Sequence, residues 1–283
     1  MTDTNQLPLL LDCHQHCWKY DPVVHNWITD GMSVLKQDYL PSQLGNLLSA
    51  NNVLGTIVVQ AEQSEAETDF LLELADQHPF IKGIVGWIDL CQPELAERLA
   101  KYANEKKLKG FRHILQSETP DFMLQKAFVD GLRILGNAGY TFDLLLYPQH
   151  IAAATELVGQ LPHLNFVVDH MAKPAIRQGV IAGWQEDIAT LAKYPNVSCK
   201  LSGMVTEADW KSWKYDDFVP YLDHIVNCFG TARLMVGSDW PVCLLAASYA
   251  DCLDIVRAYI GSFTMAEQVK VLYSNAARFY RIS

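Results

Sequence analysis

The chain has 283 residues, of which 50% are hydrophobic and 19% charged, so it can bury a large core and is not of a disordered class. Its 22 Lys and Arg against 32 Asp and Glu give a formal net charge of −10, which argues against a nucleic-acid partner. Seven scattered cysteines without CxxC pairs, no signal-peptide pattern and no run of roughly 18 apolar residues predict a cytoplasmic protein, neither secreted nor in the membrane.

Short apolar runs rich in β-branched residues alternate with longer amphipathic stretches along the whole chain. This alternation is typical of repeated βα units around a parallel sheet. The predicted strands are residues 9–14, 55–60, 83–88, 108–113, 142–147, 165–170, 197–202 and 234–239. The predicted helices are residues 39–51, 67–78, 93–105, 125–139, 150–161, 184–195, 217–230 and 249–261.

Eight strands, each followed by a helix, predict an α/β fold of the (β/α)8 TIM-barrel type. An open, doubly wound sheet is the alternative, but such a sheet usually has a glycine-rich turn after its first strand, where this chain has HQH. No linker or low-complexity segment interrupts the alternation. We therefore interpret residues 1–283 as a single domain.

The first predicted strand ends in two histidines, His14 and His16, one residue apart. Because side chains alternate along a strand, both should project into the barrel mouth, while Cys13 should face away from His14. Two such imidazoles can share a metal ion or bind one substrate oxygen. A pair of hydrogen-bonded structural histidines is the alternative interpretation.

Other strand ends are also polar, at the end where such barrels keep their active sites. Asp239 follows the eighth strand, which is a neighbour of the first in a closed barrel, and a buried acid there must be paired, metal-bound or functional. Basic residues that could hold an oxygen-rich ligand follow three other strands: Arg112 and His113, His170 and Lys173, and Lys200. Gln60 ends the second strand, and Trp27 and Trp240 lie in or next to predicted mouth loops, as stacking faces for a sugar-like ring or as loop anchors.

Nine segments between about residues 10 and 280 resemble, in order, the landmarks of the amidohydrolase-2 family. The closest likeness is to its sugar-lactonase branch of L-fuconolactonases and L-rhamnonolactonases, and it includes LDCHQHCWKYDP, GFRHILQSE, FVVDHMAKP, CKLSGM and MVGSDWPV. The resemblance implies an amidohydrolase barrel that hydrolyses a lactone. It also implies that His14 and His16 are the first-strand pair, His170 the sixth-strand histidine and Asp239 the eighth-strand acid.

The chain departs from the wider superfamily at two strands. Metal sites there usually take a further ligand from the fifth strand and, in binuclear members, a carboxylated lysine from the fourth, whereas these strands end in LLLYP and FRH. The departure argues against a binuclear site. One divalent cation, Zn²⁺, held by His14, His16 and Asp239 and a reaction without metal both stay open.

Our main hypothesis is that Asp239 activates a water molecule for attack on the carbonyl of a small-molecule lactone, opening it to the sugar acid. The predicted catalytic residues are Asp239, His170, Arg112 and His113, and the predicted substrate-binding residues are Gln60, Lys200, Trp27 and Trp240. One alternative is a hydrolase or decarboxylase acting on a carboxylated or aromatic-derived lactone or acid. Another is a sugar-binding barrel without catalysis, and a homo-oligomer is compatible with every alternative.

Overall fold

In the computed structural model, which describes residues 8–282, eight parallel strands form one sheet in the order β1 to β8. The strands are β1 (Leu10–Gln15), β2 (Val53–Val59), β3 (Ile81–Gly86), β4 (Leu108–His113), β5 (Thr141–Leu144), β6 (Phe166–Val168), β7 (Val197–Leu201) and β8 (Leu234–Val236). Just beyond β8 the chain joins β1. The backbone N–H of Asp239 donates to the carbonyl of His14 (2.8 Å), and that of His16 donates to the carbonyl of Trp240 (2.7 Å).

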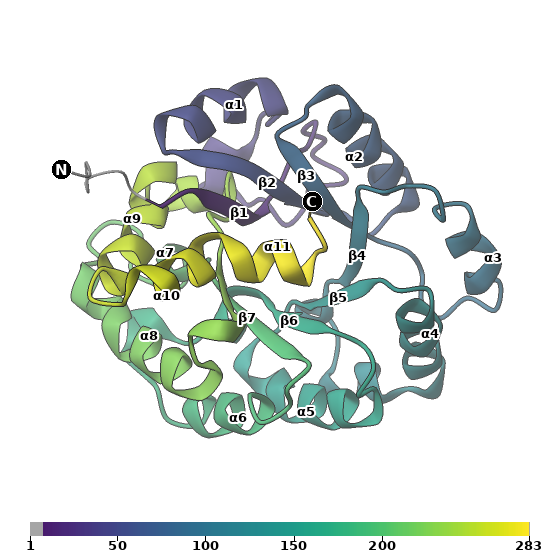
Figure 1. Cartoon of the computed structure of the whole chain (residues 1–283). Coiled ribbons are helices and arrows are strands. Elements are labelled where there is room, and N and C mark those ends of the chain that lie inside the picture. The colour runs from purple at the N-terminus through teal and green to yellow at the C-terminus, as the bar shows by residue number, and fades with distance from the viewer. Residues whose placement is uncertain (1–7, 283) are drawn as a thin grey trace.

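Eight helices follow the eight strands and surround them (Figure 1). They are α1 (Pro41–Ala50), α2 (Glu65–Gln77), α3 (Leu95–Ala100), α4 (Lys126–Asn137), α5 (Ile151–Gln160), α6 (Trp184–Leu191), α8 (Tyr215–Phe229) and α9 (Tyr249–Ile260). The predicted (β/α)8 barrel is confirmed, and each predicted strand and helix is present. Six of the eight strands stop one to three residues before their predicted ends, β5 and β8 the earliest, because the chain there turns into the loops that carry the polar residues.

Besides short 3-10 turns in the loops, the structure has short elements outside the predicted set: α7 (Met204–Glu207), α10 (Met265–Val269), a π-helical turn (Lys270–Ser274) and α11 (Asn275–Phe279). In Figure 1, α11 lies across the near end of the barrel, and it contacts β1 and β8. Arg281 lies beside Lys109, near the start of β4, so this is the amino-terminal end of the strands. The opposite end is left for the loops that follow the strands.

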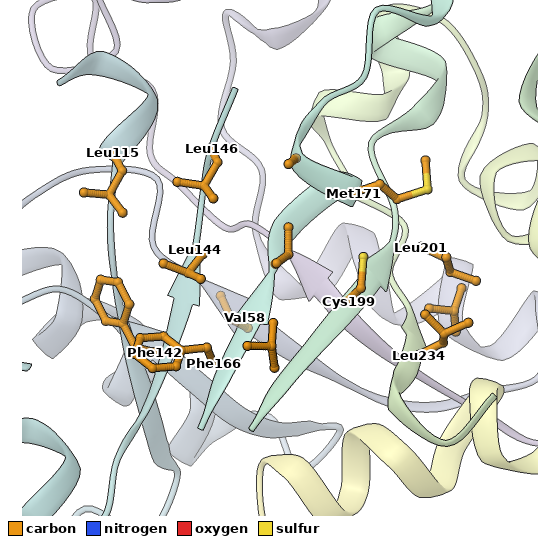
Figure 2. Close-up of a cluster of buried hydrophobic side chains, with 14 of the residues drawn as sticks. Val58, Leu115, Phe142, Leu144, Leu146, Phe166, Met171, Cys199, Leu201 and Leu234 are labelled. Carbon is orange, nitrogen blue, oxygen red and sulfur yellow. The ribbon is translucent and has the colours of Figure 1, made fainter. Parts of the chain in front are cut away.

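Apolar side chains fill two layers. The outer layer lies between the strands and the helices and includes Phe142, Leu144 and Leu201 (Figure 2). The inner layer fills the barrel lumen with side chains such as Ile57 and Val167. Alternation along each strand separates the layers, so a residue next to an outward-facing one points inward. Within residues 8–282, no helix is both long and apolar enough to cross a membrane.

Candidate active site

A β-bulge in β1 sets the direction of its side chains. Asp12 pairs with Thr56 and Gln15 with Val58, so β1 has one more residue than β2 over this stretch. Cys13 therefore packs in the lumen layer, and His14 contacts lumen residues as well. The prediction that Cys13 faces away from His14 is wrong, because it assumed regular alternation across the bulge.

Asp12 points to the outside of the barrel and ties the first strand to the last. Its carboxylate accepts hydrogen bonds from the backbone N–H of His14 (3.2 Å) and Ser238 (2.9 Å), and from the hydroxyls of Ser238 (2.6 Å) and Tyr249 (3.0 Å). Burial raises the pKa of Asp12 to about 6, although these hydrogen bonds lower it. The two chain segments that carry His14 and Asp239 are thus fixed relative to each other.

Four side chains from three parts of the barrel meet at the carboxyl end of the strands; we call them the histidine cluster: His14, His16, His170 and Asp239. The Nε2 atoms of His14 and His16 are 3.2 Å apart. The Oδ1 atom of Asp239 lies 3.4 Å from His16 Nε2, 3.8 Å from His14 Nε2 and 3.9 Å from His170 Nε2. All four residues are at most 4% exposed, so their polar atoms face one another rather than water.

His170 reaches the cluster from a strained turn. Residues 170–173 all have positive φ, between 49° and 58°, a region that side chains with a Cβ rarely occupy. Gly203 lies against the imidazole, and a Cβ there would come within 2.6 Å of His170 Nδ1. The hydroxyl of Ser202 lies 2.9 Å from the same atom. The surroundings of His170 therefore fix its ring so that Nε2 points at Asp239.

The ring nitrogens that face away from the cluster are also occupied. His16 Nδ1 lies 2.7 Å from the carbonyl of Val59, which can only accept, so His16 donates there and its Nε2 has a lone pair when the ring is neutral. Partners of this kind orient the histidines of metal sites.

Two nitrogens bound to one tetrahedral Zn²⁺ lie roughly 3.3 Å apart, close to the spacing of His14 and His16. Within the described residues, His14, His170 and Asp239 can place one ligand atom each within 4.8 Å of one another. The cluster fits one divalent cation.

Burial and charge set the protonation of the cluster. Burial lowers the pKa of His14 well below its ordinary value and that of His170 to about 4. Burial raises the pKa of Asp239, but the neighbouring imidazoles, His170 first, outweigh it and hold the pKa well below its usual range. At neutral pH, His14 and His170 are thus neutral and Asp239 is a carboxylate. These are the states that a metal ligand or a general base needs.

Arg112 projects from β4 into the lumen beside the cluster. Its Nη1 donates to Asp169 Oδ2 (3.1 Å) and lies 3.3 Å from His14 Nε2, and its Nη2 donates to the backbone carbonyl and to the side chain of Gln60. Gln60 is fully buried and in turn donates to the carbonyl of Arg112 (3.2 Å). Gln60 therefore holds Arg112 in position. Its predicted contact with substrate stays a prediction.

Lys200 lies deeper in the barrel, in what we call the lumen network: Lys200, Asp143, Asp169 and Tyr280. Lys200 Nζ donates to Asp143 Oδ2 (2.5 Å) and lies 2.9 Å from Asp169 Oδ1, and the hydroxyl of Tyr280 donates to Asp143 Oδ2 (2.9 Å). Burial lowers the pKa of Lys200, but the two carboxylates outweigh it and keep the lysine charged. Lys200 is fully buried and is not among the residues that line the cavity, so its predicted contact with substrate stays a prediction.

A cavity of about 410 Å³ opens above the histidine cluster. His16, His170 and Asp239 form part of its lining, together with Arg112 and Trp27, so five of the predicted site residues meet there. Its walls also include residues that the sequence analysis did not assign to the site: Asn26, Glu62, Gln63, Gln116 and Ser117. The polar run AEQ directly after the second predicted strand was the available signal for two of them.

The loop with Glu62 and Gln63 is held in place by Glu67 at the start of α2. The Glu67 carboxylate accepts hydrogen bonds from the backbone N–H of Ala61 (2.9 Å) and of Glu62 (2.8 Å). Burial raises the pKa of Glu67 to about 8. This side of the cavity therefore depends on a carboxyl group that is itself shielded from solvent.

Two predicted site residues lie elsewhere. His113 is on the outer side of β4, where it stacks on Phe122 (ring centroids 5.1 Å apart) and approaches Glu118 (3.2 Å). Its predicted catalytic role stays a prediction, and this placement does not support it. Burial lowers the pKa of His113. Trp240 is 2% exposed and packs edge-on against Tyr39 in the core, which leaves it the role of a loop anchor.

Active sites of (β/α)8 barrels lie at the carboxyl end of the strands, where this chain places three histidines and an aspartate. Residues 11–282 match the family model described as amidohydrolase, and the chain belongs to this family.

The chain is similar to two curated proteins over nearly its whole length. It is 39% identical to an L-fucono-1,5-lactonase of Burkholderia multivorans, covering 97% of this chain and 96% of the relative. It is 32% identical to an L-fucono-1,5-lactonase of Burkholderia ambifaria, covering 96% and 95%. Among solved structures, an amidohydrolase from Burkholderia multivorans with bound zinc superposes with a TM-score of 0.94 at 39% identity, over 97% of this chain and 100% of that one.

Proposed function

We propose that this protein is a lactonase that opens the 1,5-lactone of a sugar acid by hydrolysis. The observation that carries the proposal is the histidine cluster, where an ionised Asp239 faces a cavity large enough for one sugar ring. The two lactonase relatives, at 39% and 32% identity, support lactone hydrolysis over the decarboxylase and binding alternatives.

Asp239 is the proposed general base. Its carboxylate takes a proton from a water molecule, and the water oxygen attacks the lactone carbonyl carbon. When the bond between this carbon and the ring oxygen breaks, Asp239 returns the proton to the ring oxygen. The products are a hydroxyl group and a carboxylic acid, which releases its own proton to solvent.

Negative charge develops on the carbonyl oxygen during the attack. Arg112 is the strongest donor at the cavity, because its guanidinium stays charged and is held by Asp169 and Gln60. A well-placed donor to such an oxyanion contributes roughly 3–4 kcal/mol to catalysis. His170 lines the same part of the cavity and is the second proposed contact with the reacting carbonyl.

We propose that the histidine cluster holds one Zn²⁺ ion, with ligands from His14, His16 and Asp239, which leaves His170 for the substrate. When bound, such an ion supplies Lewis acidity, which lowers the pKa of water and polarises a carbonyl. The zinc bound to the 39% identical amidohydrolase supports this proposal. A reaction that proceeds without metal is the alternative, in which His14 and His16 contact the substrate directly.

The cavity walls suit a polyhydroxylated ring. Trp27, Val24 and Leu145 offer apolar surface, while Glu62, Gln63 and Lys173 offer hydrogen-bonding groups. We propose that the apolar wall packs on a face of the sugar ring and the polar wall binds its hydroxyl groups. Free thiols at all seven cysteines support a cytoplasmic location, where a lactonase of this kind would serve carbohydrate catabolism.

Acid release from a panel of aldono-1,4- and 1,5-lactones, followed with a pH indicator, tests the proposal. The panel includes L-fucono-1,5-lactone, and the protein is assayed after treatment with chelator and again after addition of Zn²⁺. We expect turnover of 1,5-lactones that rises with Zn²⁺. Equal turnover after chelation would refute the metal but keep the lactonase, and no lactone turnover in either state would refute the lactonase.

A further inference from the structure

Two members of the lumen network require opposite protonation of one atom, His14 Nδ1. Lys200 Nζ lies 3.1 Å from this nitrogen, and Asp169 Oδ1 lies 3.3 Å from it. An ammonium group only donates, so it needs a lone pair on Nδ1, whereas a carboxylate needs an N–H there. One nitrogen cannot satisfy both partners at once.

The same conflict exists at the other nitrogen of the ring. His14 Nε2 lies 3.2 Å from His16 Nε2 and 3.3 Å from Arg112 Nη1. Because His16 donates from Nδ1 to Val59, its Nε2 can accept a hydrogen bond from His14 Nε2. Arg112, in contrast, can only donate a hydrogen bond to His14 Nε2. Lys200 and His16 therefore favour the tautomer of His14 with the proton on Nε2. Asp169 and Arg112 favour the tautomer with the proton on Nδ1.

Lys200 decides between the two tautomers because its ammonium is fixed in place 3.1 Å from His14 Nδ1. Lys200 cannot withdraw, because it is fully buried and its ammonium is held by Asp143 at 2.5 Å. Asp169 is already shared between two cations, Lys200 and Arg112, which leaves it a weaker acceptor for His14.

We propose that Lys200 is a positioning residue that holds the His14 proton on Nε2 and so weakens the binding of a divalent cation to the histidine cluster. A cation needs a lone pair on Nε2. Its binding therefore moves the proton, through exchange with water, to Nδ1, where Asp169 accepts the hydrogen bond and Lys200 loses one. The positive charge of Lys200 acts in the same direction. This inference rests on the cation site of the proposed function.

The test is the Zn²⁺ dissociation constant of the full-length protein, measured by competition with a chromophoric chelator. Partners behind the metal ligands typically change affinity by about 10 to 100-fold. We expect Lys200→Met to bind Zn²⁺ at least roughly tenfold more tightly than the wild type, and Asp169→Asn to bind it more weakly by a similar factor. Lys200→Met that binds Zn²⁺ no more tightly than the wild type overturns the inference.

Lys173→Met is the matched control for charge alone. Lys173 lines the same cavity, but its ammonium lies near Glu207 (3.7 Å) and over the ring of Tyr147. An equal tightening in both lysine variants would assign the effect to net charge and overturn the role of the His14 hydrogen bond. If Lys200→Met does not fold, the double variant Lys200→Met with Asp143→Asn removes one cation and one anion together, and we expect the same tightening.

Nitrogen-15 NMR of histidine-labelled protein reads the tautomer directly. In chelator-treated wild type we expect His14 protonated on Nε2, and in Lys200→Met protonated on Nδ1. His14 protonated on Nδ1 in the chelator-treated wild type refutes the inference. Wild-type protein that binds no Zn²⁺ refutes the cation site of the proposed function, and the tautomer then decides the role of Lys200 separately.

Discussion

The histidine cluster and the lumen network share the barrel interior but treat charge in opposite ways. In the network, Lys200 faces the anions Asp143 and Asp169, and Arg112 pairs with Asp169 from outside it, so the buried charges are balanced within the protein. In the cluster, nitrogen atoms of three histidines converge on the carboxylate of Asp239. Both regions are buried, yet only the cluster borders the cavity, through His16, His170 and Asp239. The difference indicates that the cluster is built for a ligand and the network for support.

The largest effect is expected at the cluster. Asp239→Asn keeps the shape of the side chain but removes the group that accepts the proton from water, so kcat/KM for a lactone should fall by about 10³-fold or more. The measurement is the pH-indicator assay, with thermal unfolding as the control for folding. A folded variant that keeps activity within about tenfold of wild type would contradict the role of Asp239.

Substitutions in the lumen network should lower the stability of the fold rather than the activity. Asp143→Ala leaves the Lys200 ammonium with one carboxylate fewer and the Tyr280 hydroxyl without its acceptor, and breaking a buried ion pair costs about 3–5 kcal/mol. Denaturant unfolding measures this loss. The remaining folded protein should keep far more of its kcat/KM than Asp239→Asn does. A stable but inactive Asp143→Ala variant would place Asp143 in the chemistry and remove the contrast between the two regions.

Glu67, at the rim of the cavity, should make the free energy of unfolding depend on pH. Its pKa is about 8 in the folded protein, against an ordinary value of 4.5, so between these values the folded state keeps a proton that the unfolded chain releases. The free energy of unfolding should therefore decrease as pH rises from about 4.5 to 8, by at most about 1.4 kcal/mol per pH unit from this group. Unfolding of wild type and Glu67→Gln across this range measures it. An equal slope in both proteins would contradict the raised pKa.

The smallest effect is expected from Tyr280→Phe. The substitution removes one hydrogen bond to Asp143 and leaves the ring in place, so the free energy of unfolding should fall by only about 1 kcal/mol. The value of kcat/KM should stay unchanged, because Tyr280 is at the opposite end of the network from the cavity. A large loss of activity without loss of stability would show that the network couples the end of the chain to the chemistry.

The barrel could be predicted from the sequence because its signal is repeated eight times. The short C-terminal elements could not, because α10 and α11 are five residues each and follow the last βα unit. Their role depends on Tyr280 reaching Asp143, a contact across 137 positions of the chain that no local pattern contains.

The cluster could be predicted in part, since a strand end limits where His14, His16 and Asp239 lie. The direction of a side chain was harder. His113 and Arg112 are neighbours in β4, so they face opposite layers, and the RH pair alone did not say which one faces the cavity. The alternation of side chains along β7 places Lys200 in the lumen. How far the side chain lies below the barrel mouth depends on where β7 ends, which the sequence does not give.

Because β1 closes the barrel, one of its edges stays unpaired for most of the synthesis of the chain. On one edge β1 pairs with β2, but on the other it joins Asp239 and Trp240, which are synthesised more than two hundred residues later. Until then the edge of β1 presents unpaired N–H and C=O groups to any other chain, and such edges promote aggregation. A chaperone that shelters the nascent chain should therefore raise the yield of soluble protein.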